Sequence, residues 1–440
     1  MGVRAKWFGS VAIVFAAVLS VGPATIAQTT SGTTLFRNAR IFDGENVMPR
    51  GSVLITGNRI VAVGTDLVAP GGAKIVDGTG KTLIPGLINS HVHMVRPFPQ
   101  TGAGPFEDAA AWGVTTVVDM AGANLAMAKQ ELHSGRHPLA ADVIGAGNPA
   151  TVPDGHGFQP GGPTLTKPEE AQAFVDARIK EGSDFIKIMS ETFQYHSRNI
   201  PTLTDEAFKA VVDAAHKRGL MIVAHVEQPD RSRRAILAGV DGTVHMPAYD
   251  PPNADYAQLF RSHHAFQDTN MITFAARHFR NEIATDPDMS PYFPAWMLKQ
   301  LADAKPNADA VHAFSVAHFK QIVAEKVPYT AGTDGANYLL HVEMDIMVRD
   351  GGVTPLEALK SATSTPAGIF PHLQDRGRIA PGLRADLLLL NGDPTKNIHD
   401  TRKINTIWVG GRTVDREAFR KRQLALVQPA PNPAAAPPAQ

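Results

Sequence analysis

The sequence predicts an α/β fold, a closed (β/α)₈ barrel (TIM barrel) with a small composite β-sandwich domain formed by both ends of the mature chain. Two observations support this prediction. Between residues 85 and 376, eight short apolar runs alternate with amphipathic helical stretches. β-branched runs gather near the two ends, at 28–84 and 377–427. The runner-up is an open doubly wound sheet, but no glycine-rich phosphate loop follows the first strand, and this favours the barrel.

The first 27 residues have the pattern of a secretory signal peptide. Arg4 and Lys6 form a positive start, an apolar core runs from Val11 to Val21, and small residues near Ala27 offer a cleavage site. The apolar core is shorter than a membrane-spanning helix requires. We therefore expect a periplasmic or secreted protein that is not bound to a membrane after cleavage.

Strands of the β domain are expected in two sets. The first set is predicted at 34–41, 52–63, 74–76 and 82–84, and the second at 385–390, 406–409 and 412–414. We expect the two half-sheets to combine into one domain closed by both ends of the chain. Residues 428–440 contain only Pro, Ala, Asn and Gln, a composition that cannot build a core and predicts a disordered tail.

The strands of the barrel are predicted at 87–93, 115–120, 142–146, 184–190, 221–227, 242–246, 271–275 and 328–334. Helices are expected between them, at 168–181, 204–218 and 230–238 among others. Asp205 and Glu206 favour the start of the second of these helices, and Gly219 ends it. Residues 278–308 exceed an ordinary loop. Inserted after the seventh strand, they are expected to form a lid or substrate wall over the barrel mouth, or a partner contact.

Composition narrows the classes of function. The 42 basic residues balance 42 acidic ones, which gives no reason to expect a nucleic acid or an anionic membrane as a partner. The absence of cysteine excludes disulfides, thiolate metal ligands and a cysteine nucleophile. A metal must therefore be held by nitrogen and oxygen atoms. The expected partner is a small-molecule substrate, and a homo-oligomer stays open.

The most informative motif is His91-Val92-His93, at the end of an apolar run. Residues i and i+2 of a strand share a face, so both imidazoles point the same way. Two neutral imidazoles suit a transition metal such as zinc. The pair alone is more readily explained by ordinary core or surface histidines.

Four further strand ends carry polar residues that are costly in a core. Lys187 interrupts an apolar run, where it either pairs with a buried carboxylate or becomes a neutral amine able to capture CO₂. His225 and His245 each close an apolar strand, at the end where barrel active sites are built. Asp334 follows the eighth strand and alone could be a helix N-cap. Together with His91 and His93, these residues predict a metal site.

With these residues the chain resembles the amidohydrolase superfamily of metal-dependent hydrolases. The stretch Pro85-Gly86-Leu87-Ile88 resembles the family's entry to the first strand, and residues 377–387 resemble its return to the β domain. The resemblance implies two divalent ions, commonly zinc. His91, His93 and Asp334 would hold one ion, expected to be the more buried, and His225 and His245 the other, with a CO₂-derived carbamate on Lys187 as the bridge. It also implies attack by a metal-bridging hydroxide, with Asp334 as general base and then acid.

Within the superfamily, Lys187 favours the binuclear branch with a carbamylated lysine. Adenosine-type and cytosine-type deaminases and imidazolonepropionase look mononuclear and lack a bridging lysine at this place. The surroundings of Lys187, and Gly155-His156-Gly157, resemble exported prolidase-like and ochratoxin-degrading amidohydrolases. There are departures. Many relatives have a second histidine soon after the strand-five ligand, whereas this chain has His225-Val226-Glu227, and the glycines common after the lysine are missing.

We therefore expect an exported enzyme that cleaves an amide C–N bond in a dipeptide, an N-acyl amino acid or an ochratoxin-like amide. The alternatives are a lactone, ester or organophosphate hydrolase on the same centre, and a non-catalytic binding protein on a barrel scaffold. Candidates for orienting ligand histidines are Glu227 and Asp119, for which loop capping is the simpler explanation. Loop position gives the candidates for substrate binding: His156, Tyr195, Arg198 and His278, with His196 and Arg277 beside them.

Overall fold

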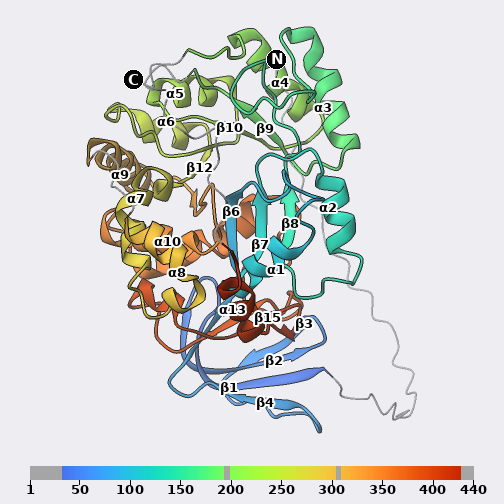
Figure 1. Ribbon diagram of the computed structural model, residues 1–440, viewed down its shortest axis with the longest axis vertical. Helices are drawn as coiled ribbons and strands as arrows, with labels where there is room; N and C mark the ends of the chain where they lie inside the picture. Colours follow the sequence, from blue (N-terminus) through green and yellow to red (C-terminus); the bar gives the residue numbers. More distant parts are fainter. Residues whose placement is uncertain (1–31, 193–198, 304–308, 428–440) are drawn as a thin grey trace, which may run out of the picture.

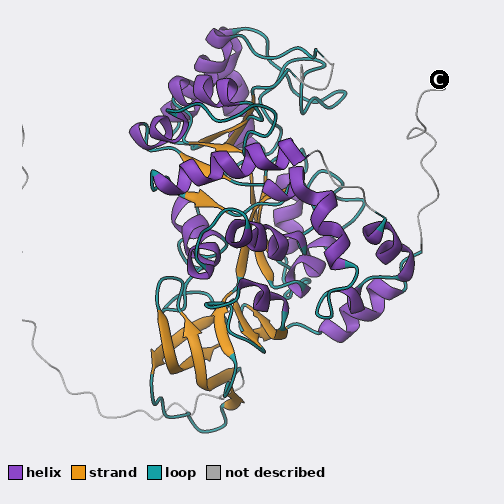
Figure 2. Ribbon diagram, turned by 90° about the vertical axis from the view of Figure 1, so that its left-hand side faces the viewer, coloured by secondary structure: helices purple, strands orange, loops and turns teal. Residues whose placement is uncertain are grey.

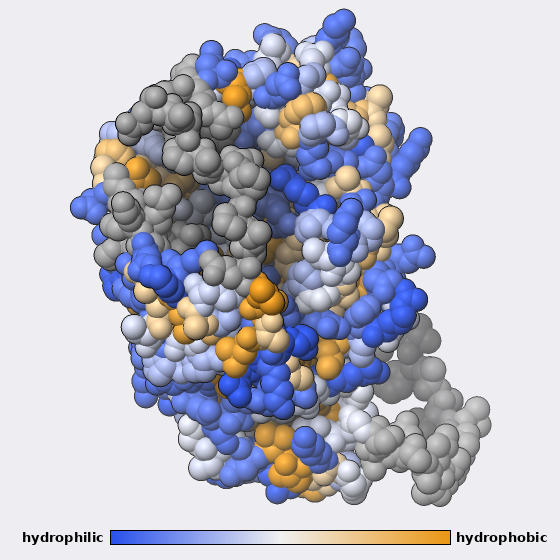
Figure 3. Space-filling model, in the orientation of Figure 1, coloured by the Kyte–Doolittle hydropathy of each residue, from blue (hydrophilic) through white to orange (hydrophobic). Residues whose placement is uncertain are grey.

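The computed structural model describes residues 32–192, 199–303 and 309–427. The predicted signal peptide at 1–27 and the predicted tail at 428–440 lie outside these ranges. Among the described residues, every helix is too short or too polar to cross a membrane. On the face shown in Figure 3, apolar residues form small separate groups among polar ones.

One sheet joins the two ends of the described chain, at the bottom of Figure 1. Its strands are β1 (Thr33–Phe42), β2 (Val47–Thr56), β3 (Arg59–Gly64), β4 (Lys74–Asp77), β5 (Thr82–Pro85), β14 (Leu387–Leu390), β15 (Ile404–Val409) and β16 (Arg412–Thr413), in the order β16-β15-β14-β5-β1-β2-β3, with β4 beside β1. The antiparallel pairing of β14 with β5 links the late strands to the early ones. The sheet encloses its own core, in which the rings of Phe36 and Trp408 meet edge to face at 4.7 Å.

A second set of strands is wholly parallel and lies above that sheet (Figure 1). β6, β7 and β8 form one sheet, and β9 to β13 form another. The strands are β6 (Leu87–Val92), β7 (Val114–Asp119), β8 (Asp142–Gly145), β9 (Ile186–Met189), β10 (Ile222–His225), β11 (Gly242–Val244), β12 (Phe266–Asp268) and β13 (Tyr329–Thr330).

Hydrogen bonds join the edges of the two parallel sheets. The amide of Ala150, after β8, donates to the carbonyl of Lys187 at 2.8 Å, and the amide of Ser90 donates to the carbonyl of Ala331 at 3.1 Å. The α/β class is thus confirmed. The predicted closed barrel, however, is not one continuous ladder among the described residues, because β13 has only two residues and β8 stops five residues before its contact with β9.

Helices cover the parallel strands, as Figure 2 shows in purple. They are α1 (Gly104–Ala111), α2 (Leu125–Leu132), η1 (Pro168–Glu170), α3 (Ala171–Lys180), α4 (Asp205–Lys217), α5 (Pro229–Ala238), α6 (Tyr256–Ser262), α7 (Met271–Ile283), η3 (Ser290–Tyr292), α8 (Ala295–Ala302), α9 (Asp309–Ala324), α10 (Leu339–Arg349), α11 (Pro355–Ser361), α12 (Ser364–Ile369), η4 (Ile398–Arg402) and α13 (Arg416–Leu424). In α4, the hydroxyl of Thr204 caps the first turn by accepting from the amide of Ala207.

The prediction of a strand at 271–275 is wrong. The seventh parallel strand is β12, and Met271 instead begins helix α7. The carboxylate of Glu343 accepts hydrogen bonds from the amides of Met271 and Ile272, at 3.0 and 2.7 Å, and so caps the helix. β12 escapes a search for apolar runs because two of its three residues, Gln267 and Asp268, are polar although fully buried.

The described part of the 278–308 insertion packs against α13 and against Trp112, which follows α1 and precedes β7. Phe293 stacks on Trp112 at 5.5 Å between ring centroids, and Tyr292 stacks on Phe419 of α13 at 5.8 Å. The indole nitrogen of Trp296 donates to the carbonyl of Leu426 at 3.0 Å. These contacts make the segment a support between the helices and the C-terminal part of the chain, and the expectation of a lid over the barrel mouth is wrong for this part.

Candidate metal centre

Six polar residues meet at the C-terminal ends of the parallel strands. His91 lies in β6 and His93 directly after it, Lys187 lies in β9, and His225 ends β10. His245 follows β11, and Asp334 follows β13 after a short loop. These are the six residues that the sequence predicts as metal ligands, and the fold brings them together from strands up to about 240 residues apart.

The first group consists of His91, His93 and Asp334. The Nε2 atoms of the two histidines lie 3.3 Å apart, and His93 Nε2 lies 2.9 Å from Asp334 Oδ1. Burial alone would raise the pKa of Asp334, but the hydrogen bond with His93 and the nearby His245 and Lys187 lower it to about 2. The group therefore presents an ionised carboxylate beside two imidazoles.

The second group consists of His225, Glu227 and His245. His225 Nε2 lies 3.5 Å from Glu227 Oε1, and the rings of His225 and His245 are 4.5 Å apart. One ligand atom from each of the three residues lies within 4.8 Å of the others. Burial is the main cause that lowers the pKa of His245 to about 3 and the pKa of His225 well below its usual value, so both imidazoles are neutral.

The second group is the more buried one, contrary to the expectation for His91 and His93. The side chains of His225, Glu227 and His245 are 5%, 11% and 2% exposed. In the first group, His93 is 30% and Asp334 is 24% exposed. His91 is buried, whereas the other two members of the first group are partly open to solvent.

Lys187 is fully buried beside both groups. Its Nζ atom has no hydrogen-bond partner among the described residues. Burial lowers its pKa to about 7, against the opposing effect of Asp334 and Asp268. A large fraction of the side chain is therefore a neutral amine near neutral pH, the form that the sequence argument requires.

Two residues with positive φ and one glycine allow the side chains of the candidate centre to approach one another closely. His245 and Asp334 both adopt positive φ, at 72° and 48°, which turns each side chain out of its strand direction. A Cβ at Gly332 would lie 2.4 Å from Asp268 Oδ1 and 2.7 Å from His91 Cβ. Only glycine lets β13 approach β6 this closely.

Sequence reasoning missed two residues behind His91. Asn270 Nδ2 lies 2.8 Å from His91 Nδ1, and Asp268 Oδ1 lies 3.7 Å from the same atom. Both residues are fully buried, and burial raises the pKa of Asp268 to about 8. They were missed because β12 was missed. The useful signal was Asp268-Thr269-Asn270, a polar run directly after a strand.

The remaining predicted residues divide into three cases. His156 reaches the centre, with its ring 4.2 Å from that of His225, and burial lowers its pKa to about 4. Tyr195 and Arg198, with His196, lie outside the described residues. The predicted loop position of Arg277 and His278 is wrong, because both belong to helix α7; the structure does not describe their side chains.

Asp119 supports the loop after His93. Its carboxylate accepts hydrogen bonds from the amides of Val95, at 2.8 Å, and Ala121, at 3.2 Å. Burial raises its pKa to about 6. Loop capping therefore explains Asp119.

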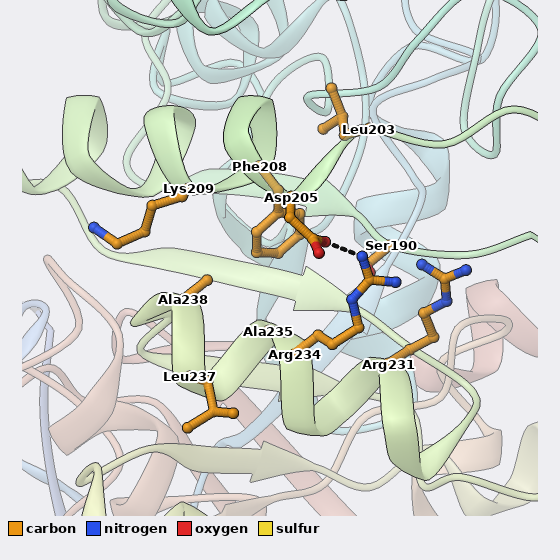
Figure 4. A pocket seen from close by; sticks show the side chains of 10 residues that line it. All are labelled: Ser190, Leu203, Asp205, Phe208, Lys209, Arg231, Arg234, Ala235, Leu237 and Ala238. Atoms are coloured by element: carbon orange, nitrogen blue, oxygen red, sulfur yellow. Dashed lines mark hydrogen bonds and ion pairs between the residues drawn. The ribbon is translucent and has the colours of Figure 1, made fainter.

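A separate cavity of about 290 Å³ lies between α4 and α5 (Figure 4). Arg234 and Asp205 form an ion pair across it, and Phe208 and Ala235 contribute apolar wall. Ser190, which follows β9, is the residue it shares with the strand ends. None of the six predicted ligands lines this cavity, so it is not the candidate centre.

Comparison with known proteins finds a family match and several similar proteins. The model of the family described as "Amidohydrolase family" matches residues 82–414. The ochratoxinase of Aspergillus niger is 22% identical, covering 89% of this chain and 88% of the relative. The imidazolonepropionase of Streptomyces griseus subsp. griseus is 24% identical, covering 82% and 92%. A solved Xaa-Pro dipeptidase matches with a TM-score of 0.70 and 23% identity, over 87% of this chain and 99% of that one.

Proposed function

Because this chain belongs to the amidohydrolase family and is a hydrolytic enzyme, we propose that it uses two divalent metal ions, of which zinc is the expected kind, to cleave an amide C–N bond. The observation that carries the proposal is the meeting of His91, His93, His225, His245 and two carboxylates near one buried lysine whose Nζ has no hydrogen-bond partner among the described residues. We further propose that the two parallel sheets are two arcs of a (β/α)₈ barrel, since hydrogen bonds link them at both edges.

The residues present fit two metal ions. The donor set is nitrogen and oxygen only, which suits zinc and related ions. His225 Nε2 and His245 Nδ1 are buried without a hydrogen-bond partner among the described residues, a costly state that a bound cation would relieve. His91, His93 and Asp334 would hold one ion, and His225 and His245 the other. Bound ions would lower the pKa of water and polarise the scissile carbonyl.

Lys187 would become the bridge between the two ions by reacting with CO₂. The neutral amine attacks the carbon of CO₂, a C–N bond forms, and one N–H proton leaves to solvent, which gives a carbamate anion. The reaction removes a buried amine without a partner and supplies two oxygen donors. It needs the neutral amine, and the pKa of about 7 for Lys187 provides it.

Asp334 would transfer the proton during hydrolysis. Its pKa of about 2 keeps the carboxylate ionised and able to accept a proton from the attacking water. Asp334 is 24% exposed, so a substrate arriving from solvent would be able to reach it. After accepting the proton, Asp334 would donate it to the leaving nitrogen.

The proposed substrates are a dipeptide, an N-acyl amino acid or an ochratoxin-like amide. Similarity to proteins named ochratoxinase and Xaa-Pro dipeptidase supports this class. His156, beside His225, is the described candidate for substrate contact, and Tyr195, Arg198 and His278 stay candidates from the sequence. Residues 1–27 support export to the periplasm or the medium. Ester, lactone or phosphotriester hydrolysis on the same centre is the second candidate.

One experiment tests the proposal. Metal-loaded protein is assayed against N-acyl amino acids, dipeptides, lactones and phosphotriesters, with Lys187→Ala as the control. We expect amide substrates to give the highest kcat/KM. We also expect Lys187→Ala to be inactive until a short carboxylic acid is added to replace the bridge. Preferred hydrolysis of lactones or phosphotriesters would overturn the substrate class, and full activity of Lys187→Ala without added acid would overturn the bridged centre.

A further inference from the structure

We infer that Glu227 is a direct, third protein ligand of the ion held by His225 and His245. The inference rests on the metal centre proposed above and extends it. It departs from the pattern in which that ion is held by two histidines and the bridge alone.

Strand geometry places Glu227 on the ligand face. His225 and Glu227 are two residues apart, so they share a face where the chain stays extended, as His91 and His93 do at the end of β6. Past the end of β10, the backbone stays hydrogen-bonded to β11 and the residues after it. The amide of Val226 donates to the carbonyl of Val244, and the amide of Ala248 donates to the carbonyl of Glu227, both at 3.3 Å.

Distance and burial support ligation. Glu227 Oε1 lies 3.5 Å from His225 Nε2, and both fall within the 4.8 Å group completed by His245. Two ligands of one tetrahedral ion at 2.0–2.2 Å from it are separated by roughly 3.3–3.6 Å. The spacing of Glu227 and His225 is therefore that of two neighbours on one ion.

The ligand set has a chemical precedent. Catalytic zinc sites commonly use three protein ligands, and two histidines with one glutamate is one of the recurring sets. With Glu227 included, both groups of this centre become two histidines and a carboxylate. The second ion would then have three protein ligands without the carbamate of Lys187.

A neighbouring glutamate offers a matched control. Glu191 is also buried, but its carboxylate accepts hydrogen bonds from the amides of Thr192 and Glu227, at 2.8 and 3.2 Å. It is not part of either group of ligand atoms. Glu191 is therefore a second buried glutamate close by, and its carboxylate binds backbone amides.

The test is zinc binding to full-length protein stripped with a chelator. Stoichiometry is measured by elemental analysis, and affinity by competition with a chromophoric chelator. We expect two ions for the unaltered protein. In Glu227→Gln, we expect the second ion to bind more weakly by more than the roughly 10–100-fold that loss of an outer-shell partner causes. Glu191→Gln should bind both ions as the unaltered protein does. Lys187→Ala should retain two ions, and Lys187→Ala combined with Glu227→Gln should retain one.

The outcomes separate the two proposals. If the unaltered protein binds two ions and Glu227→Gln binds both with unchanged affinity, the role of Glu227 is overturned and the binuclear centre stands. If the unaltered protein binds no more than one ion, both fall. Should Glu227→Gln fail to fold, anomalous diffraction from zinc-loaded crystals of the unaltered protein decides. A Glu227 oxygen at about 2.0–2.2 Å from zinc supports ligation, and a carboxylate turned away from the ion rejects it.

Discussion

The two ligand groups of the centre have similar chemistry and different surroundings. The first, His91, His93 and Asp334, opens to solvent and its members already contact one another. The second, His225, Glu227 and His245, is buried, and two of its imidazole nitrogens, His225 Nε2 and His245 Nδ1, have no hydrogen-bond partner among the described residues. In the proposed centre this difference would correspond to a division of roles: the open group would exchange protons and meet the substrate, and the buried group would hold an ion.

The largest expected effect comes from the open group. Asp334→Asn keeps the shape of the side chain, and asparagine tolerates the positive φ of 48° at this position. Loss of the ionised carboxylate should lower kcat by about 10²–10⁴-fold. Thermal unfolding should change little, because the group is partly solvated. Steady-state kinetics and a melting curve check this, and an active Asp334→Asn enzyme would refute the proton-transfer role.

The next effect concerns the buried side, where Lys187 is expected to cost stability. In metal-free protein, Lys187→Met should raise the free energy of unfolding at pH 6–7 by about 1–4 kcal/mol, because it replaces a buried charged group by an apolar one of similar length. Activity should be lost in the same variant. Urea denaturation of the chelator-treated proteins measures the difference, and a less stable Lys187→Met would show that Lys187 has a stabilising partner.

The unaltered protein and Lys187→Met should differ in how their free energies of unfolding depend on pH. The pKa of Lys187 is lowered to about 7 in the folded chain from an ordinary value of 10.5, so between these values the unfolded state binds more protons. The stability contributed at this position therefore rises with pH from about 7 towards 10.5, by at most about 1.4 kcal/mol per pH unit. Lys187→Met should lack this slope. Equal slopes for both proteins between pH 7 and 9 would count against the lowered pKa.

The smallest expected effect concerns Asn270, which lies behind His91 of the open group. A metal on Nε2 of His91 requires the proton on Nδ1, and the Asn270 amide, whose nitrogen now faces Nδ1, would flip to accept that proton on its oxygen. Asn270→Gly keeps the positive φ of 45° and removes the amide. The first ion should bind about 10–100-fold more weakly. Zinc competition measures this, with Asp119→Asn as a control that should bind zinc as the unaltered protein does.

Much of the centre was accessible to sequence reasoning because its members end apolar runs. His91, His93, Lys187, His225 and His245 stand out since each is polar where a strand should be apolar. Asp268 and Asn270 were missed for the opposite reason. Their strand, β12, is short and polar, and it is buried by its neighbours and not by its own hydrophobicity. Met271–Ile283 has apolar residues at its start and still forms a helix, whose first turn is capped by Glu343 from a distant part of the chain.

The sequence by itself determined the kind of donor atoms, through the absence of cysteine, and the strand-end positions of the six predicted ligands, through the two-residue period of a strand. Only the tertiary structure decided which group is buried, that Glu227 joins His225, and that the strand hydrogen bonds form two sheets. The physical reason is that periodicity acts along the chain. Burial and the distance between ligands depend on strands that meet from up to about 240 residues apart.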